Sequence, residues 1–285
     1  MRFTCEKSML VQGLNIASRT VAQKSSLSVI EGILCRAGHV LSLTGYNMET
    51  AITYEIAAEV SDPGVCILPA KLFGDIIRRL QAAANQSGVA IVSSFICLPT
   101  MGQRLVNRGF MITPNPTSSP LKGELEGVQI QDKRHLYAHG GEDQFFQPAQ
   151  ERHIFEYKGV KILLLVCYDL RFPVWARNRS GHDYDIILVV ANWPDIRIQY
   201  WDALIAARAT ENQCYIAAVN CVGDDGMGLH YNGHSVAYDT RLQPIAHFED
   251  NEEGTKIAEF DIAKLHHFRE VLPLWKDVDQ FKMQM

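Results

Sequence analysis

The sequence predicts an α/β layered domain over residues 82–285, preceded by a smaller α+β segment over residues 1–81. Two observations support this division. The first segment alternates short strand-like runs with helix-like runs. After Gly88 the chain changes to fully apolar runs, such as KILLLVC and DIILVVAN, separated by helical and polar stretches. Runs of this kind are typical of strands buried on both faces of a sheet.

The composition is that of a globular protein able to bury a core. Hydrophobic residues make up 47% of the 285 positions and charged residues 21%, which excludes a disordered chain, collagen and a coiled coil. The formal net charge of −5 provides no global positive field for nucleic acid or anionic lipid. No apolar run has the length of a signal sequence or of a membrane span. We therefore expect a soluble cytoplasmic protein with no membrane partner.

Two predicted helices frame the N-terminal segment. Residues 6–21 have apolar side chains every three to four positions, which predicts an amphipathic helix. Pro69 stands at the start of a second expected helix over residues 70–86, a position where proline is tolerated. Four short strand-like runs separated by turn residues lie between the helices: 28–37, 39–47, 50–60 and 65–68.

The larger segment contains one clear helix and one irregular stretch. Residues 197–212 carry Trp201, Ile205 and Ala209 on one stripe, so this helix should cover a sheet face. Residues 113–126 hold three prolines and a Ser/Thr cluster, which predicts a surface loop.

Cys167 is a candidate nucleophile because it directly follows an apolar strand-like run. Strand ends are where α/β folds present reactive groups, although a cysteine in this place is more often a packing residue. A thiolate needs a neighbouring base or cation, and its acyl intermediate needs hydrogen-bond donors for the oxyanion. Lys133 and Glu142 lie in one charged segment, and the Tyr168 N–H follows the cysteine. A lone lysine of this kind is usually a solvated surface residue.

Four sequence blocks carry a family resemblance. They are DKRHLYAHGGED (132–143), LVCYDLRFPVWARN (165–178), ANWPDIRIQYWDALIAARATENQCYIAAVNCVGDDGMG (191–228) and YNGHSVAYD (231–239). In this order and at these intervals the blocks resemble the nitrilase superfamily of carbon–nitrogen hydrolases, within it the ω-amidase branch. The resemblance implies an α-β-β-α sandwich, here incomplete, that commonly forms dimers through its helical faces. It also implies hydrolysis of a small carboxylate-bearing amide by a Cys, Glu and Lys triad, without a metal or cofactor.

The resemblance implies a role for each candidate residue. Cys167 would attack the amide carbon, release ammonia and leave a thioester. Lys133 would stabilise the oxyanion together with the Tyr168 N–H. Glu142 matches an accessory glutamate that orients the lysine and the substrate. Trp193 is expected to line the pocket, with plain core packing as the alternative.

The third member of the family's triad has no counterpart. In the family, a general-base glutamate follows a Leu-Pro pair in an N-terminal block. This chain reads ILPAKLFG at 67–74, with Ala70 in the place of the acid. Alanine cannot accept a proton, so we expect very weak or no turnover. The N-terminal part of the sandwich is expected to be missing.

Residues 1 to about 80 contain the blocks MRFTCEKSMLVQGLNIASRTV, EGILCRAGHVLSLTGYNMETAI and ILPAKLFGDIIRRL. These blocks resemble a different family, the first domain of the bacterial DNA polymerase III β sliding clamp. The resemblance covers part of one clamp domain and implies a chimera joined between Leu80 and Gly88. It leaves two alternatives to an amidase: a DNA-replication protein that binds clamp partners through residues 1–81, or a non-functional chimera.

The histidines and cysteines do not predict a metal site. None of the ten histidines has HxH or HExxH spacing, and the seven cysteines lack CxxC pairs. We expect His266 and His267 to be solvated on a surface helix. His135 and His153 are alternative bases for Cys167, as in papain-like enzymes.

Overall fold

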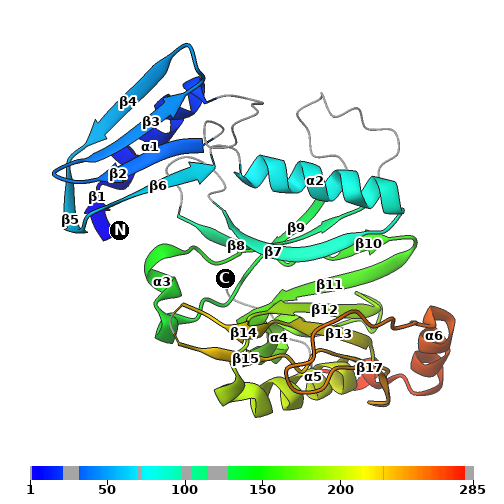
Figure 1. Ribbon diagram of the computed structural model, residues 1–285. Helices are drawn as coiled ribbons and strands as arrows, with labels where there is room; N and C mark the ends of the chain where they lie inside the picture. The colour runs from blue at the N-terminus through cyan, green and yellow to red at the C-terminus, as the bar shows by residue number, and fades with distance from the viewer. Residues whose placement is uncertain are drawn as a thin grey trace. The chain divides into compact units, whose positions relative to one another are not determined.

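The computed structural model describes residues 2–21, 32–69, 72–97, 104–114, 128–226 and 228–279. The chain forms two compact units: unit 1 comprises residues 1–80 with 100–103, and unit 2 comprises 81–99 with 104–285. The boundary falls inside helix α2 (Leu72–Ser87), next to the boundary expected from the sequence (Figure 1). Ala70 and most of the loop expected over 113–126 lie outside the described residues.

Unit 1 is an antiparallel sheet with one helix packed against it. The sheet order is β4-β3-β2-β6, and β1 pairs with β5. Helix α1 (Lys7–Ala17) packs on β3 and β4, and Ala17 joins Leu41 and Leu43 in the core. The remaining elements are β1 (Arg2–Cys5), a 3₁₀ turn (Ser18–Thr20), β2 (Gly32–Ala37), β3 (Leu41–Tyr46), β4 (Ala51–Ile56), β5 (Ala58–Asp62) and β6 (Gly64–Pro69).

Most of the elements expected in this unit are confirmed. The strand-like run over 50–60 is different, because it forms two strands, β4 and β5, that pair with different partners. Nothing in its local composition marks this change of partner. The part of the first strand-like run before Gly32 lies outside the described residues.

Unit 2 stacks two sheets face to face. The smaller sheet, β7-β8-β9, is antiparallel, and the larger one has the order β10-β11-β12-β13-β16-β17. Strands β11, β12 and β13 are parallel to one another. The strands are β7 (Ile91–Cys97), β8 (Val106–Ile112), β9 (Val128–Asp132), β10 (Phe155–Tyr157), β11 (Val160–Val166), β12 (Ile186–Ala191), β13 (Tyr215–Asn220), β14 (Val222–Asp224), β15 (His230–Asn232), β16 (Val236–Tyr238) and β17 (Pro244–His247).

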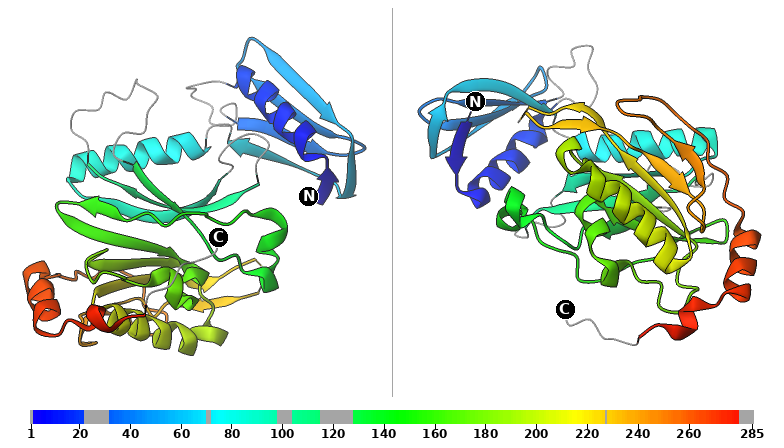
Figure 2. Two further views of the ribbon diagram at one scale, coloured as in Figure 1. Left: turned by 180° about the vertical axis from the view of Figure 1, so that it is seen from behind. Right: turned by 90° about the horizontal axis from the view of Figure 1, so that it is seen from below.

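Helices cover the outer faces of both sheets. The C-terminal part of α2 lies on the smaller sheet, and α5 (Ile198–Asn212) lies on the larger one (Figures 1 and 2). Trp201, Ile205 and Ala209 of α5 are buried, as its apolar stripe predicts. The expected layered α/β architecture is therefore confirmed. The other helices are α3 (Glu142–Phe145), α4 (Pro173–Ala176), α6 (Ile262–Val271) and the 3₁₀ turns Ala138–Gly140, Cys167–Arg171, Asp195–Arg197 and Leu274–Asp277.

Strand β11 is buried on both faces, which explains its continuous apolar sequence. Leu163 and Leu165 pack in the core under α5, whereas Ile162 and Leu164 pack in the core between the sheets. This alternation follows the two-residue period of a strand. The carboxyl end of β11 is therefore held between two packed layers.

A buried ion pair attaches α6 to the larger sheet. Arg269 is 1% exposed, and its guanidinium lies 3.3 Å from the Asp185 carboxylate. Asp185 also accepts a hydrogen bond from the Lys161 N–H. His266 was expected to be solvated, and its side chain is 51% exposed, although its Nε2 also lies 2.8 Å from Asp185.

None of the helices that the structure describes combines the length and the apolar character needed to cross a lipid bilayer.

Gly109 tests the packing between the sheets. A Cβ at this position would lie 2.7 Å from Leu164 Cδ2 and 3.1 Å from the Gln131 carbonyl oxygen. We expect Gly109→Ala to lower the free energy of unfolding of unit 2 by about 1–3 kcal/mol. All four tryptophans lie in unit 2, so the thermal unfolding of this unit can be followed by their fluorescence.

Gly226→Ala is the matched control, since Gly226 has nothing within 4 Å of the added Cβ. Both substitutions change the unfolded chain alike. Equal melting temperatures for the two variants would contradict the close packing at Gly109.

Candidate active site

The candidate site lies at the carboxyl ends of the parallel strands of unit 2. Cys167 follows β11, and Asn192 follows β12. Parallel strands present their carboxyl ends at one edge of a sheet, where ligands bind in many α/β folds. A pocket of about 170 Å³ lies there. Its lining residues are Lys133, Tyr137, Glu142, Cys167, Tyr168, Arg171, Asn192, Trp193, Pro194, Arg197, Leu229 and Tyr231.

The structure brings all five residues predicted for the site into this one pocket. Trp193 lines the pocket and is also 3% exposed, so both interpretations of this residue apply. Its indole N–H donates to the Arg197 carbonyl oxygen at 2.9 Å. The roles that the resemblance implies for these residues stay predictions.

Cys167 begins a sharp turn at the end of β11. Its φ of 48° lies in the left-handed region that non-glycine residues rarely adopt. The turn continues as the 3₁₀ segment Cys167–Arg171, and the thiol lies 3.8 Å from the Asn192 carbonyl oxygen. Such backbone strain is common at functional sites, where the surrounding structure holds it in place.

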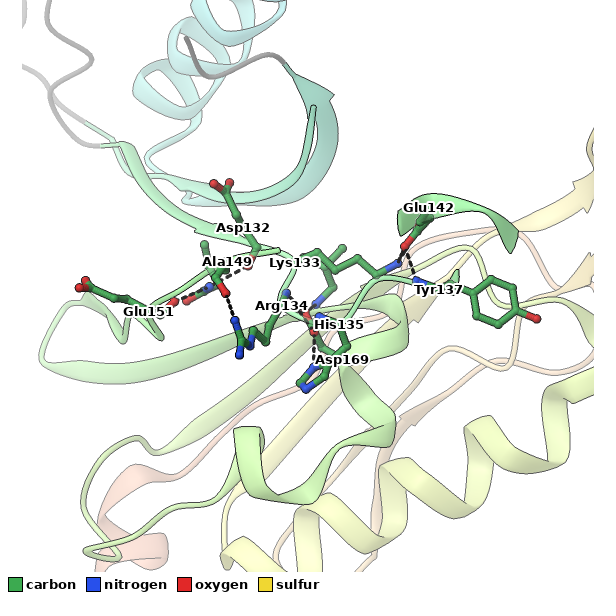
Figure 3. A network of polar contacts seen from close by, with 11 residues as sticks. Asp132, Lys133, Arg134, His135, Tyr137, Glu142, Ala149, Glu151 and Asp169 are labelled. Atoms are coloured by element: carbon green, nitrogen blue, oxygen red, sulfur yellow. Dashed lines mark hydrogen bonds and ion pairs between the residues drawn. The ribbon is translucent and has the colours of Figure 1, made fainter. Parts of the chain in front are cut away.

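Lys133 is a buried cation held by a carboxylate. The side chain is 2% exposed, and Nζ donates to both oxygens of Glu142, at 2.8 and 2.7 Å (Figure 3). Glu142 also accepts a hydrogen bond of 2.7 Å from the Tyr137 N–H. An ammonium group so deeply buried needs a partner of this kind to remain charged. The pair therefore places a fixed positive charge in the wall of the pocket.

Opposing effects act on the Cys167 thiol. Burial raises its pKa above the ordinary value, and the charge of Lys133 partly opposes this effect. The carboxylates of Glu142 and Asp169 raise the pKa further. The net shift is upward, so the neutral thiol is the resting form near neutral pH. Cleavage of an amide by this sulfur therefore requires a proton acceptor.

The described residues offer no free carboxylate for this purpose. A second hollow of about 550 Å³ adjoins Cys167 and is lined in part by Ile96 of β7 and Val219 of β13. Glu142 is the one acidic residue among the described residues that line this hollow and the pocket. Both its oxygens contact Lys133. The acid that the family pattern requires is therefore absent from the part of the site that the structure describes.

The two alternative histidine bases do not line the pocket. His135 Nδ1 lies 2.9 Å from Asp169, and its ring stacks on Phe172 with ring centroids 3.7 Å apart. The backbone N–H of His153 donates to the Gln131 side-chain oxygen at 2.7 Å. A papain-like arrangement with Cys167 is therefore not formed by either residue.

Two arginines of the pocket were missed from the sequence. The Arg171 guanidinium lies 5.0 Å from the ring centroids of both Trp193 and Tyr200. That of Arg197 lies 5.5 Å from the ring of Tyr137. Both arginines stand within the quoted sequence blocks, but no spacing rule separates a pocket arginine from a surface one. Their charges suit an anionic group on a ligand.

Within the described ranges, no three His, Cys, Asp or Glu side chains are grouped so that they can hold a metal ion. That the chain uses no cofactor stays a prediction.

Comparison with known proteins identifies the family. The profile of the carbon–nitrogen hydrolase family matches residues 41–270. This chain belongs to the carbon–nitrogen hydrolase family. The predicted resemblance to the nitrilase superfamily is thereby confirmed.

Individual relatives agree with this assignment. The chain is 40% identical over 210 residues to Omega-amidase YafV of Escherichia coli K12, covering 73% of this chain and 76% of the relative. It is 36% identical over 157 residues to the 2-oxoglutaramate amidase of Bacillus subtilis, covering 54% and 60%. Among solved structures it resembles XC1258 from Xanthomonas campestris, a CN-hydrolase superfamily protein with an arsenic adduct in its active site. That similarity has a TM-score of 0.65 and 37% identity, covering 75% of this chain and 78% of the other.

The family match begins at residue 41, inside the segment predicted to resemble a sliding clamp. None of the relatives named above is a clamp protein. The clamp-like character of residues 1–80 stays a prediction.

The charge of Lys133 gives a test of the site's electrostatics. Lys133→Gln removes the one effect that lowers the Cys167 pKa through charge, so the pKa should rise. We expect alkylation of Cys167 by iodoacetamide at mildly alkaline pH to slow about tenfold, the factor for one pKa unit. Peptide-resolved mass spectrometry measures this rate.

Lys158→Gln is the control, because Lys158 lies in the turn before β11 and does not line the pocket. Unchanged alkylation of Cys167 in the Lys133 variant would show that the ammonium does not act on the sulfur.

Proposed function

We propose that this chain is an ω-amidase-like hydrolase that cleaves a short carboxylate-bearing amide through a thioester on Cys167. The observation that carries the proposal is one pocket holding the strand-end thiol, the buried Lys133 ammonium and two arginines. The names of the relatives, Omega-amidase and 2-oxoglutaramate amidase, support this choice of substrate class.

Each step of the reaction has a candidate group in the pocket. The Cys167 sulfur attacks the amide carbon, and the oxygen that gains negative charge is stabilised by Lys133 and the Tyr168 N–H. The proton of the thiol is transferred to the amide nitrogen, the carbon–nitrogen bond breaks, and the nitrogen leaves as ammonia. Water then attacks the thioester, which releases the carboxylic acid and restores the thiol.

Proton transfer is the weak step of this sequence. The thiol rests in its protonated form, and Glu142 is bound to Lys133 instead of standing free. General-base assistance typically contributes a factor of about 100 to 10,000. We therefore propose that amide turnover by this chain is slower by about this factor than in an enzyme that has the missing acid.

The two arginines account for the preference for a carboxylate. Arg171 and Arg197 line the pocket, and aromatic rings hold both guanidinium groups in place. An arginine fork binds a carboxylate through two parallel hydrogen bonds. An amide with a carboxylate at its far end would place that group on the arginines and its carbonyl carbon near the sulfur.

Ammonia release from 2-oxoglutaramate tests the reaction. We expect slow release by the unmodified chain and none by Cys167→Ala, measured by a coupled glutamate dehydrogenase assay. Cys221→Ala is the control, since Cys221 lines the adjoining hollow but not the pocket. Equal rates for the unmodified chain and Cys167→Ala would exclude the thioester route.

Substrate charge tests the role of the arginines. Arg197→Gln should raise KM for the carboxylate-bearing amide about tenfold or more, because a charged hydrogen bond contributes about 1.5–3 kcal/mol. KM for an uncharged amide of the same length should change little. An equal rise in KM for both amides would assign Arg197 a structural role instead.

Three further predictions from the sequence also remain proposals. They are dimer formation through the helical faces, a cytoplasmic location, and binding of replication-clamp partners by residues 1–81. For the last, unit 1 is a separate compact unit with its own core, which is the arrangement a binding module needs.

A further inference from the structure

Asp169 is a buried carboxylate that the proposed reaction does not use. It is 1% exposed and lies two residues after Cys167 in the 3₁₀ turn. Charged side chains are almost never buried to this degree unless they are paired or fully hydrogen-bonded. Its surroundings show what satisfies it.

The carboxylate accepts hydrogen bonds from two separate segments of backbone. The first segment provides the Val166 N–H, at 3.3 Å. The second provides the N–H groups of Arg134 and His135, at 3.1 and 2.8 Å (Figure 3). The ring nitrogen Nδ1 of His135 also lies 2.9 Å from the Asp169 oxygen that accepts the His135 N–H.

These contacts join the two halves of the proposed site. Val166 directly precedes Cys167, whereas Arg134 and His135 directly follow Lys133. The carboxylate thus binds the backbone next to the nucleophile and next to the ammonium-bearing residue. Hydrogen bonds to an ionised acceptor are roughly twice as strong as neutral ones, and here they hold a strained turn.

We propose that Asp169 is a positioning residue that holds Lys133 in register with Cys167, so that both face the same amide group. This inference rests on the proposed function, because the register matters for the oxyanion of that reaction. Asp169 does not line the pocket, and it acts through the backbone of its neighbours.

Asp169 does not activate the Cys167 thiol through its charge. As an anion, it raises the pKa of Cys167 and disfavours the thiolate. Removing the charge alone would therefore make Cys167 more reactive. Loss of the register would move the Lys133 ammonium away from the sulfur and make Cys167 less reactive. A role through charge and a role through positioning therefore predict opposite changes in the reactivity of Cys167.

Asp169→Asn in the full chain distinguishes them. The amide keeps the shape of the side chain but turns an NH₂ group toward N–H donors. We expect alkylation of Cys167 by iodoacetamide to slow about tenfold or more at mildly alkaline pH, and its pH profile to move to higher pH, because small displacements in a site have effects of this size. Cys5, a partly exposed thiol in unit 1, is the internal reference in the same digest. Faster or unchanged alkylation of Cys167 would overturn the proposal.

Asp185→Asn is the matched control for lost stability. Asp185 is also buried and also accepts a backbone N–H, from Lys161, but it anchors α6. Its substitution should lower the melting temperature without slowing Cys167. If Asp169→Asn does not melt cooperatively, Asp169→Ser, which keeps one acceptor oxygen, takes its place. Equal slowing in the Asp169 and Asp185 variants would reduce Asp169 to a general stabilising residue.

A double-mutant cycle with Lys133→Gln tests whether Asp169 acts through the lysine. In the Lys133→Gln background, Asp169→Asn should no longer slow alkylation, and only the faster reaction that follows from the lost negative charge should remain. Full additivity would contradict the proposal. Alkylation of Cys167 does not require amide turnover. If the chain releases no ammonia from the amide but the alkylation rates change as predicted, the proposed function is wrong and the positioning role of Asp169 remains.

Discussion

The buried ion pair between Lys133 and Glu142 is the interaction on which the site depends. It keeps an ammonium group charged at a place where water is nearly excluded, and it fixes that charge in the same pocket as the Cys167 sulfur. A charge in such surroundings acts more strongly than one in water. Burial has the largest effect on the Cys167 pKa, and without the pair the charge of Lys133 would no longer oppose it.

The same pair also limits the site. Glu142 is bound through both oxygens to Lys133 and also accepts the Tyr137 N–H, so neither oxygen is left free to face the thiol. No second acid lines the pocket or the adjoining hollow among the described residues. In the reaction that we propose, the oxyanion would be stabilised but no second carboxylate would assist proton transfer. This is the reason for proposing weak activity.

The sequence predicted those features that depend on local pattern. The apolar run of β11 and the cysteine after it identified the strand end, because a strand buried on both faces has no polar positions. Lys133 and Glu142 were found through resemblance alone, since nothing in a charged loop shows that its lysine turns inward. Arg171, Arg197 and Asp169 were missed because their roles depend on contacts with distant segments. For Asp169 the partners lie 34 and 35 residues away. The change of pairing between β4 and β5 was missed for the same reason.

The protonation state of Cys167 at rest tests the account most directly. A thiolate absorbs in the ultraviolet where a thiol does not, so the difference in absorbance between this chain and Cys167→Ser, followed against pH, gives the pKa of this one group. The account predicts a pKa above the ordinary cysteine value of about 8.5. A pKa below neutral would mean that the sulfur is already ionised at rest, and the need for a missing base would disappear.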